Sequence, residues 1–162
     1  MTTHCLNTKQ IADMYMNKTI EIKQLHHDVK IPKYATAGSA AIDLSARTFG
    51  DEIMIAPGNS VLIKTGIAVH INDPGLVGVL ASRSGHGLKN RVRLGNGIGV
   101  IDSDYQQEIG VILYNDGDQI FWVKPGDRIA QLMFMPVVQV NLMVVEGFSE
   151  ETGRGGFGST GV

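Results

Sequence analysis

Hydrophobic and polar residues alternate along much of the chain after residue 18, with the period of two that is typical of β-strands with one buried face. In the stretch TIEIKQL, Ile20 and Ile22 alternate with Glu21 and Lys23, which predicts a half-buried strand. The same pattern predicts strands over residues 19–25, 61–71, 76–81, 108–115, 119–124, 128–134 and 137–145. Gly66 interrupts a β-branched stretch, where we expect a bend.

Turn sequences separate these predicted strands. APGN (Ala56–Asn59) and KPGD (Lys124–Asp127) place Pro and then Gly at the centre of a type II turn, where proline sets the first φ and glycine accepts the positive φ that follows. Short strands joined by such turns predict an all-β sandwich or barrel. The segment SGHGLKN is the one internal stretch compatible with a short helix.

The pattern also divides the chain into three parts. Residues 1–18 are weakly patterned and form an N-terminal extension of unknown role, although TKQIADMYMNK could make a short helix. Residues 19–149 carry the predicted strands and form one domain. Residues 150–162 are rich in glycine and predict a flexible tail, because ordering such a segment costs more conformational entropy than it gains.

Composition narrows the class of protein. A length of 162 residues with 43% hydrophobic residues fits one globular domain with a core. The formal net charge of −2 argues against a protein that binds duplex nucleic acid. The sequence contains no run of 18 apolar residues, so it predicts no membrane-spanning helix. A single cysteine, Cys5, and no secretory leader at the start predict a cytoplasmic protein, or one of the host cytoplasm if the source is viral.

Two polar clusters interrupt the first half of the strand pattern. In AGSAAIDLSA (Ala37–Ala46), Asp43 lies within an apolar run, where its side chain could cap a turn. In SRSGHG (Ser82–Gly87), Arg83, a hydroxyl and glycine-exposed amides supply the groups that hold phosphate oxygens. Any turn that contains serine and glycine has a similar composition, so the second cluster alone does not establish a phosphate site.

Two further clusters follow. In LGNGIGVIDSDYQQEI, Asp102 and Asp104 would share one face of a strand, so a cation, a metal or a raised pKa would have to compensate them unless they lie on a solvated turn. Tyr105 beside them could be a strand aromatic that packs on the core. In PGDRIAQLMF, Arg128 could neutralise Asp102 or Asp104, and Gln131 is the other polar residue of an apolar strand.

Taken in order, AGSAAIDLSA, RSG, GNGIGVIDSDYQQEI, PGDRIAQLMF and RGGFGSTG resemble the five motifs of the homotrimeric dUTP pyrophosphatases (dUTPases). Each fragment is weak by itself, but five in family order span most of the chain. The resemblance implies a β jelly roll and a homotrimer whose three active sites are each built from more than one chain. It also implies an enzyme that converts dUTP and water to dUMP and pyrophosphate with Mg²⁺. That reaction keeps uracil out of DNA and supplies dUMP for thymidylate synthesis.

The resemblance also implies roles for residues of the third motif. Asp102 would be the general base that takes a proton from the water attacking the α-phosphorus. Tyr105 would pack under the deoxyribose and leave no space for a 2′-hydroxyl. Asn96 and the backbone of a hairpin over residues 97–101 would read the uracil edge. The base and sugar ligands implied in this region are Asn96, Val100, Ile101, Tyr105 and Gly110.

The phosphate ligands implied by the resemblance come from three motifs. Those of the folded domain are Arg83, Ser84, Gly85 and Gln131. In the tail, Arg154 would clamp the γ-phosphate and Phe157 would stack on the uracil. The remaining tail ligands are Gly155, Gly156, Gly158 and Ser159, with Thr160 as a further hydroxyl. The tail would then close as a lid over bound substrate.

Asp43 matches the family aspartate that holds a water on Mg²⁺ rather than the ion itself. The triphosphate and waters would be the direct ligands, which suits a hard cation that dehydrates reluctantly. Arg128 and Asp104 would have structural roles, with Arg128 bracing the acidic strand.

The chain departs from the family pattern at a few positions. Gln107 replaces the usual glycine of the third motif and would strain the backbone if that position needs a positive φ. Ala41, Ser82 and the pair His86–Gly87 are smaller changes, the last of which could loosen the helix. Two alternative functions stay open: a related dCTP deaminase, possibly with dUTPase activity as well, and a regulatory nucleotide-binding protein.

Overall fold

The computed structural model describes residues 18–150 and 152–156. Its elements are β1 (Glu21–Gln24), β2 (Ile42–Ser45), β3 (Ile53–Ile55), β4 (Ser60–His70), β5 (Leu76–Ala81), α2 (Ser84–Asn90), β6 (Val92–Leu94), β7 (Gly99–Ile101), β8 (Glu108–Asn115), β9 (Phe121–Val123) and β10 (Arg128–Pro136). The all-β prediction with one short helix is confirmed for these residues, and the predicted helix SGHGLKN coincides with α2. No helix in this part of the chain is long and apolar enough to cross a membrane.

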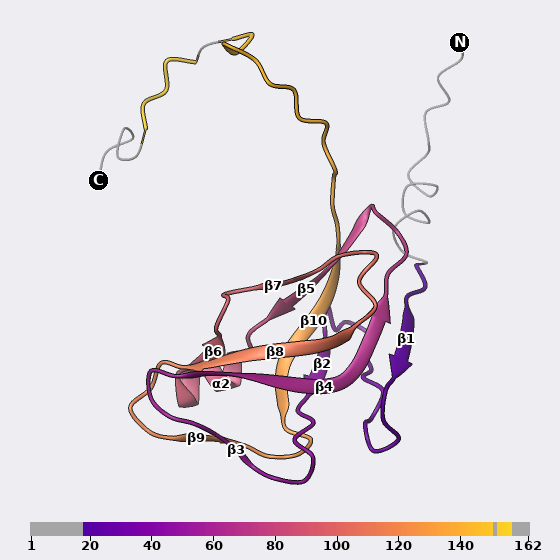
Figure 1. The fold of residues 1–162 in the computed structure, drawn as a ribbon, viewed down its shortest axis with the longest axis vertical. Coiled ribbons are helices and arrows are strands. Elements are labelled where there is room, and N and C mark those ends of the chain that lie inside the picture. The colour runs from indigo at the N-terminus through magenta and orange to yellow at the C-terminus, as the bar shows by residue number, and fades with distance from the viewer. Residues whose placement is uncertain (1–17, 151, 157–162) are drawn as a thin grey trace.

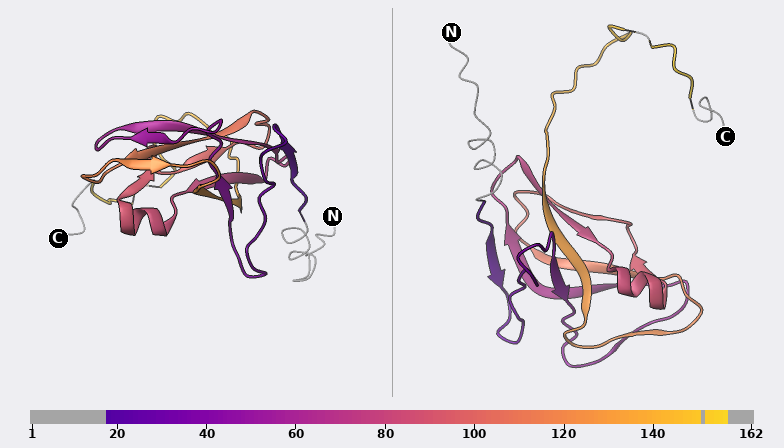
Figure 2. Two further views of the ribbon diagram at one scale, coloured as in Figure 1. Left: turned by 90° about the horizontal axis from the view of Figure 1, so that it is seen from below. Right: turned by 180° about the vertical axis from the view of Figure 1, so that it is seen from behind.

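Two four-stranded antiparallel sheets and one small ribbon make up the fold (Figure 1). The strand order is β1-β4-β8-β6 in the first sheet and β2-β10-β5-β7 in the second, and β3 pairs with β9. The sheets lie in two layers (Figure 2). Strands that are consecutive in the sequence lie in different sheets, which is the connectivity of the jelly-roll type of β-sandwich.

The core lies between the two layers and follows from the period-two pattern. In β5 and β8 every second side chain is buried, while the alternate ones are more exposed. Both sheets contribute fully buried aliphatic side chains, among them Leu44, Leu132, Ile63, Val111 and Leu113. Because both faces of the core are built from alternate residues, a shift of one residue in any strand would expose its apolar face.

The two Pro-Gly turns form as predicted. In APGN the N–H of Asn59 donates to the carbonyl of Ala56 at 3.1 Å, and Gly58 has a φ of +74°. In KPGD the N–H of Asp127 donates to the carbonyl of Lys124 at 3.1 Å, with Gly126 at +81°. Both glycines therefore adopt the left-handed conformation that a type II turn requires.

The predicted bend in the longest strand is also present. β4 shifts register against β8 between Lys64 and Ala68, and Gly66 within this interval has a φ of +69°. By contrast, the half-buried character predicted for the first strand is wrong, because all four residues of β1 are exposed. β1 is an edge strand that pairs only with β4. Ile20, which lies just before β1, packs against the core.

The apolar segment over residues 137–145 does not form the predicted strand. After Pro136 the chain leaves the domain as an extended arm (Figure 1). Its large apolar side chains are exposed, with Leu142 and Val144 at 92% and 100%. Alternation of this kind gives a strand only where the segment pairs with another strand, and the arm pairs with none in the described part of the chain.

Candidate active site

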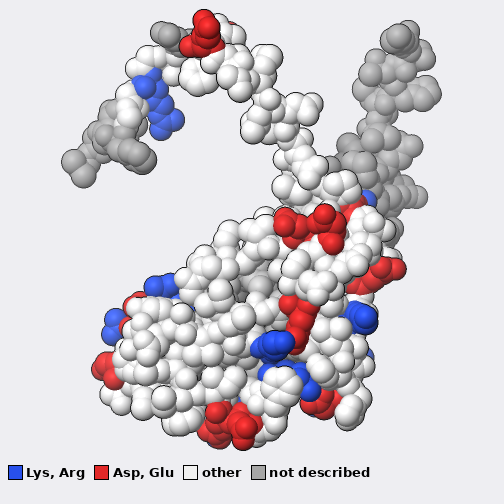
Figure 3. Space-filling model, in the orientation of Figure 1, with Lys and Arg blue, Asp and Glu red and all other residues white. Residues whose placement is uncertain are grey.

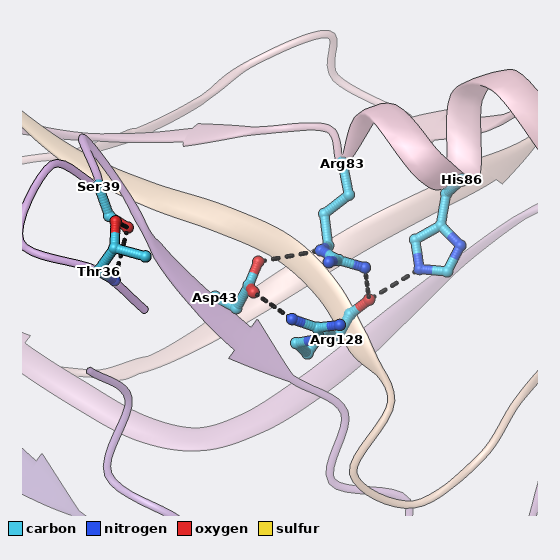
Figure 4. A network of polar contacts seen from close by, with 6 residues as sticks. All are labelled: Thr36, Ser39, Asp43, Arg83, His86 and Arg128. Atoms are coloured by element: carbon cyan, nitrogen blue, oxygen red, sulfur yellow. Dashed lines mark hydrogen bonds and ion pairs between the residues drawn. The ribbon is translucent and has the colours of Figure 1, made fainter. Parts of the chain in front are cut away.

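Asp43 lies between two arginines on the surface of the second sheet (Figure 4). Its Oδ1 accepts a hydrogen bond from Arg83 Nε at 2.9 Å, and its Oδ2 accepts one from Arg128 Nη1 at 3.1 Å. The Asp43 and Arg83 side chains are each 21% exposed. One carboxylate and two guanidiniums leave a net positive charge at this point of the surface.

The strand order explains why these residues meet. β10 lies between β2 and β5, and Gln131 pairs with Asp43 on one side and with Ala81 on the other. Arg83 follows two residues after β5 ends, as the N-cap of α2. Ser84 and Gly85, the first two residues of α2, are exposed beside it. The structure thus brings Asp43, Arg83, Ser84, Gly85 and Gln131 into one group, which we call the cationic cluster and which also includes Arg128.

The contacts of Asp43 and Arg128 differ from those that the sequence suggested. Asp43 does not cap a turn, because it lies within β2 and its carboxylate is bound by arginines. Arg128 pairs with Asp43 and not with Asp102 or Asp104. The antiparallel pairing of β10 with β2 places Arg128 beside Asp43. The local sequence of either strand does not indicate this pairing.

Asp102 and Asp104 lie on a turn rather than on one face of a strand. Asp102 follows β7 directly, and the N–H of Tyr105 donates to the carbonyl of Asp102 at 3.1 Å. Both carboxylates belong to exposed residues. The solvated turn that the sequence left open as an alternative is therefore the structure observed.

Tyr105 is held at two points. Its ring packs against the hydrophobic core, and its hydroxyl donates to the carbonyl of Glu108 at 3.0 Å. The Glu108 carboxylate in turn accepts a hydrogen bond from the N–H of Gly66 at 2.8 Å, at the bend of β4. These two contacts restrict the motion of the ring.

Asn96 lies in the loop that connects the two sheets. β6 pairs with β8 in one sheet and β7 pairs with β5 in the other, so the residues around Asn96 cross between layers. The hairpin expected over residues 97–101 is therefore wrong, because β6 and β7 do not pair with one another. Asn96 is exposed, and its carbonyl accepts a hydrogen bond from the N–H of Ile98 at 2.9 Å.

Three further predicted ligands lie on strands. Val100 is 60% exposed and Ile101 is buried in β7, the outermost strand of its sheet. Gly110 lies within β8, where an added Cβ would come within 2.7 Å of Leu62 Cδ1. The close approach of Leu62 gives Gly110 a packing reason to be glycine, and its role in substrate binding stays a prediction.

The cationic cluster and Asp102 lie far apart within one chain. β5 and β7 pair in antiparallel register, with Leu80 opposite Gly99 and Gly78 opposite Ile101. Arg83 therefore follows the end of β5 that lies beside the start of β7, whereas Asp102 follows the other end of β7. In this register Asp102 lies opposite position 77, so at about 3.4 Å per residue the six residues from there to Arg83 separate them by roughly 20 Å. One chain does not bring both groups to one phosphorus atom.

The tail residues that the structure describes also lie away from the cluster. Arg154 and Gly156 are exposed at the end of the arm, which points away from the domain (Figure 1). The N–H of Arg154 donates to Thr152 Oγ1 at 3.4 Å. Phe157, Gly158, Ser159 and Thr160 lie outside the described residues, as do residues 8–17 of the predicted helix TKQIADMYMNK.

The departures from the family pattern have little effect on the backbone. Gln107 is not among the described non-glycine residues with positive φ, so the substitution causes no strain of that kind. Ser82 contributes a hydrogen bond, because its Oγ accepts the N–H of Leu94 at 2.8 Å. His86 anchors the start of α2 through a hydrogen bond to the carbonyl of Arg128 at 2.7 Å, and the loosening of the helix by His86–Gly87 stays a prediction.

The donor groups fit a metal ion that is held mainly by substrate. In the described part of the chain, no group of three or more His, Cys, Asp or Glu side chains is placed to hold a metal. Both carboxylate oxygens of Asp43 already accept hydrogen bonds from arginine, and each keeps a lone pair that can accept one from a water. Asp43 therefore suits an outer-sphere contact to Mg²⁺ through water.

Comparison with known proteins gives a consistent result. The sequence profile of the dUTPase family matches residues 27–161. The chain is 47% identical over 149 residues to the deoxyuridine 5′-triphosphate nucleotidohydrolase of Tolumonas auensis, with 89% of this chain and 98% of the relative covered. The corresponding protein of Klebsiella pneumoniae is 47% identical over 151 residues, with 90% and 99% covered.

Solved structures with a similar fold include two from staphylococcal phages. A mutant dUTPase of Staphylococcus bacteriophage 80alpha with dUpNHpp has a TM-score of 0.75 and 27% identity, with 90% of this chain and 100% of that chain covered. A mutant dUTPase from phage phi11 of S. aureus, described with a structural Mg(II) ion, has a TM-score of 0.73 and 23% identity, with 82% and 100% covered.

Proposed function

Because the chain belongs to the dUTPase family and is a dUTP diphosphatase, we propose that it uses Mg²⁺ to hydrolyse dUTP to dUMP and pyrophosphate. In the cell this reaction keeps uracil out of DNA and supplies dUMP for thymidylate synthesis. The observation that carries the proposal is the cationic cluster, in which Asp43 pairs with both Arg83 and Arg128 beside the exposed Ser84 and Gly85. Guanidiniums fixed in this way suit recognition of phosphate oxygens.

In the proposed mechanism each group has one task. Asp102 orients the attacking water and accepts its proton, which its exposed position after a strand end allows. Arg83, Ser84, Gly85 and Gln131 bind phosphate oxygens. Mg²⁺ would offset the negative charge of the triphosphate, and Asp43 is the residue that would hold a water of the ion.

Selection of the deoxyuridine moiety falls to the third motif. The Tyr105 ring, fixed by the core and by Glu108, leaves no space for a 2′-hydroxyl. β7 is an edge strand, so one row of its backbone N–H and C=O groups has no strand partner and can pair with uracil. Cytosine has the opposite donor and acceptor order, so it would leave buried groups unpaired, at a cost of about 1–3 kcal/mol for each group.

We further propose a homotrimer in which each active site combines residues of more than one chain. The separation of Asp102 from the cationic cluster supports this arrangement, because a second copy must supply the missing group. The exposed apolar arm over residues 137–148 supports it as well, since a second copy can cover these side chains. The arm would carry Arg154, Phe157 and the tail glycines to a neighbouring site, where they close over substrate as a lid.

Release of pyrophosphate from dUTP, dTTP, dCTP and UTP, each with and without Mg²⁺, tests the proposal. We expect Mg²⁺-dependent turnover that is confined to dUTP and is nearly lost in Asp102→Asn. Ammonia release from dCTP would instead identify a deaminase. Binding of dUTP without turnover by the wild type would identify a regulatory nucleotide-binding protein.

A further inference from the structure

His86 contacts the cationic cluster, and none of the catalytic or binding roles proposed above uses its side chain. It lies in the first turn of α2, and its Nε2 is 2.7 Å from the carbonyl oxygen of Arg128 (Figure 4). Since a carbonyl oxygen only accepts hydrogen bonds, Nε2 carries the proton. The imidazole ring also meets Phe121 edge to face, with the ring centroids 5.4 Å apart and an interplanar angle of 77°. Contacts on two sides therefore fix the orientation of the ring.

The pairing of β10 with β5 does not reach Arg128, so β5 provides no hydrogen-bond donor for the Arg128 carbonyl. The last residue pair between β10 and β5 is Gln131 with Ala81, three residues beyond Arg128. On the other side, the pairing of β10 with β2 shifts register between Arg128 and Ala130. Two side chains donate to this carbonyl: His86 at 2.7 Å and Arg83 Nη1 at 3.4 Å. His86 thus supplies the shorter of the two hydrogen bonds.

We propose that His86 is a positioning residue, which holds the backbone of Arg128 so that the guanidinium of Arg83 remains directed at the phosphate chain of the substrate. This inference rests on the proposed function, in which Arg83 binds phosphate. Without the His86 donor, Arg83 Nη1 at 3.4 Å is the remaining side-chain donor to this carbonyl among the described residues. The arginine is then drawn toward Arg128 and away from the substrate.

Three variants separate this role from a purely structural one. His86→Leu removes the donor and keeps an apolar side chain against Phe121, whereas His86→Gln restores an N–H group at a similar distance from the backbone. His26→Leu is the matched control, because it makes the same substitution at an exposed histidine outside the cluster. Each is compared with the wild type for KM and kcat with dUTP, for inhibition by deoxyuridine, and for melting temperature at a fixed protein concentration.

We expect His86→Leu to raise KM for dUTP about tenfold, the effect of losing one hydrogen bond to the phosphate-binding groups. Inhibition by deoxyuridine, which has no phosphate, should be unchanged, and His86→Gln should recover most of the wild-type KM. In the wild type, ¹⁵N NMR of the imidazole should show the proton on Nε2.

Wild-type KM in His86→Leu would overturn the inference while leaving the proposed function intact. Equal losses of dUTP and deoxyuridine binding, or a lower melting temperature with unchanged KM, would show that His86 is only structural and would also overturn it. A wild type that neither binds nor turns over dUTP would overturn the proposed function itself, and with it this role for His86.

Discussion

Asp102 and Arg83 lie at opposite ends of the antiparallel ladder that joins β5 to β7. Figure 3 shows one face of the molecule, on which scattered charged groups lie among the white atoms that cover most of the surface. Leu62, at 60% exposure, and Val100, at 60%, are among the exposed apolar side chains of these sheets. The proposed site, which uses both Asp102 and Arg83, would be assembled between two copies of the chain, and this arrangement permits a direct genetic test.

Co-assembly of two inactive variants should restore activity. In an assembly of Asp102→Asn and Arg83→Gln chains, a site that takes Arg83 from one chain and Asp102 from its neighbour can contain two wild-type residues. Random mixing in a closed ring gives about a quarter of the sites this composition. Pyrophosphate release after co-expression of differently tagged chains measures the recovery. Separately purified variants that are mixed without subunit exchange are the control and should stay inactive. If both residues act from the same chain, no mixture recovers activity.

Asp102→Asn should separate binding from catalysis. Among the described residues the exposed Asp102 carboxylate forms no ion pair, so replacing it with an amide should disturb the fold little. We expect kcat to fall by about 10²–10⁴-fold, the range for losing a general base, with little change in affinity for dUTP. Single-turnover kinetics and calorimetric titration with dUTP measure the two quantities. Near-normal turnover would remove Asp102 from the mechanism.

Gly66→Ala should destabilise the domain more than an equivalent change at another positive-φ glycine. An added Cβ at Gly66 would overlap Val29 Cγ2 and lie 2.9 Å from Arg47 Cδ, and φ is +69°. Conformational strain and overpacking together should lower the free energy of unfolding by about 2–4 kcal/mol. Gly58→Ala is the control, because φ is +74° but nothing lies within 4 Å. Denaturant titration should show a loss of about 1–2 kcal/mol there. Equal losses would show that packing against Val29 adds nothing.

Arg91→Gly should stabilise the protein. Arg91 is the C-cap of α2 and has left-handed dihedral angles, φ 54° and ψ 34°, which strain a residue with a Cβ. Glycine at this position should raise the free energy of unfolding by about 0.5–1 kcal/mol, seen as a melting temperature about 1–4 °C higher. Lys89→Gly in the last turn of the same helix is the matched control and should lower the melting temperature. An unchanged or lower value for Arg91→Gly would contradict the prediction.

The sequence by itself determined the features that depend on neighbouring residues. The boundaries of β5 and β8 follow from period-two alternation, and the two Pro-Gly turns follow from the fixed φ of proline and the freedom of glycine. The motif order also identified the family, because motifs report the chemical groups present and do not require their positions in space.

Only the tertiary structure decided which residues meet across the chain. Arg128 pairs with Asp43 because β10 lies beside β2, although Asp102 and Asp104 also offered a carboxylate partner on sequence grounds. The apolar residues 137–145 have the alternation of a strand, yet they leave the domain and pair with no strand of the described part of the chain. Both outcomes depend on contacts between segments far apart in sequence, and local propensity and periodicity do not specify such contacts.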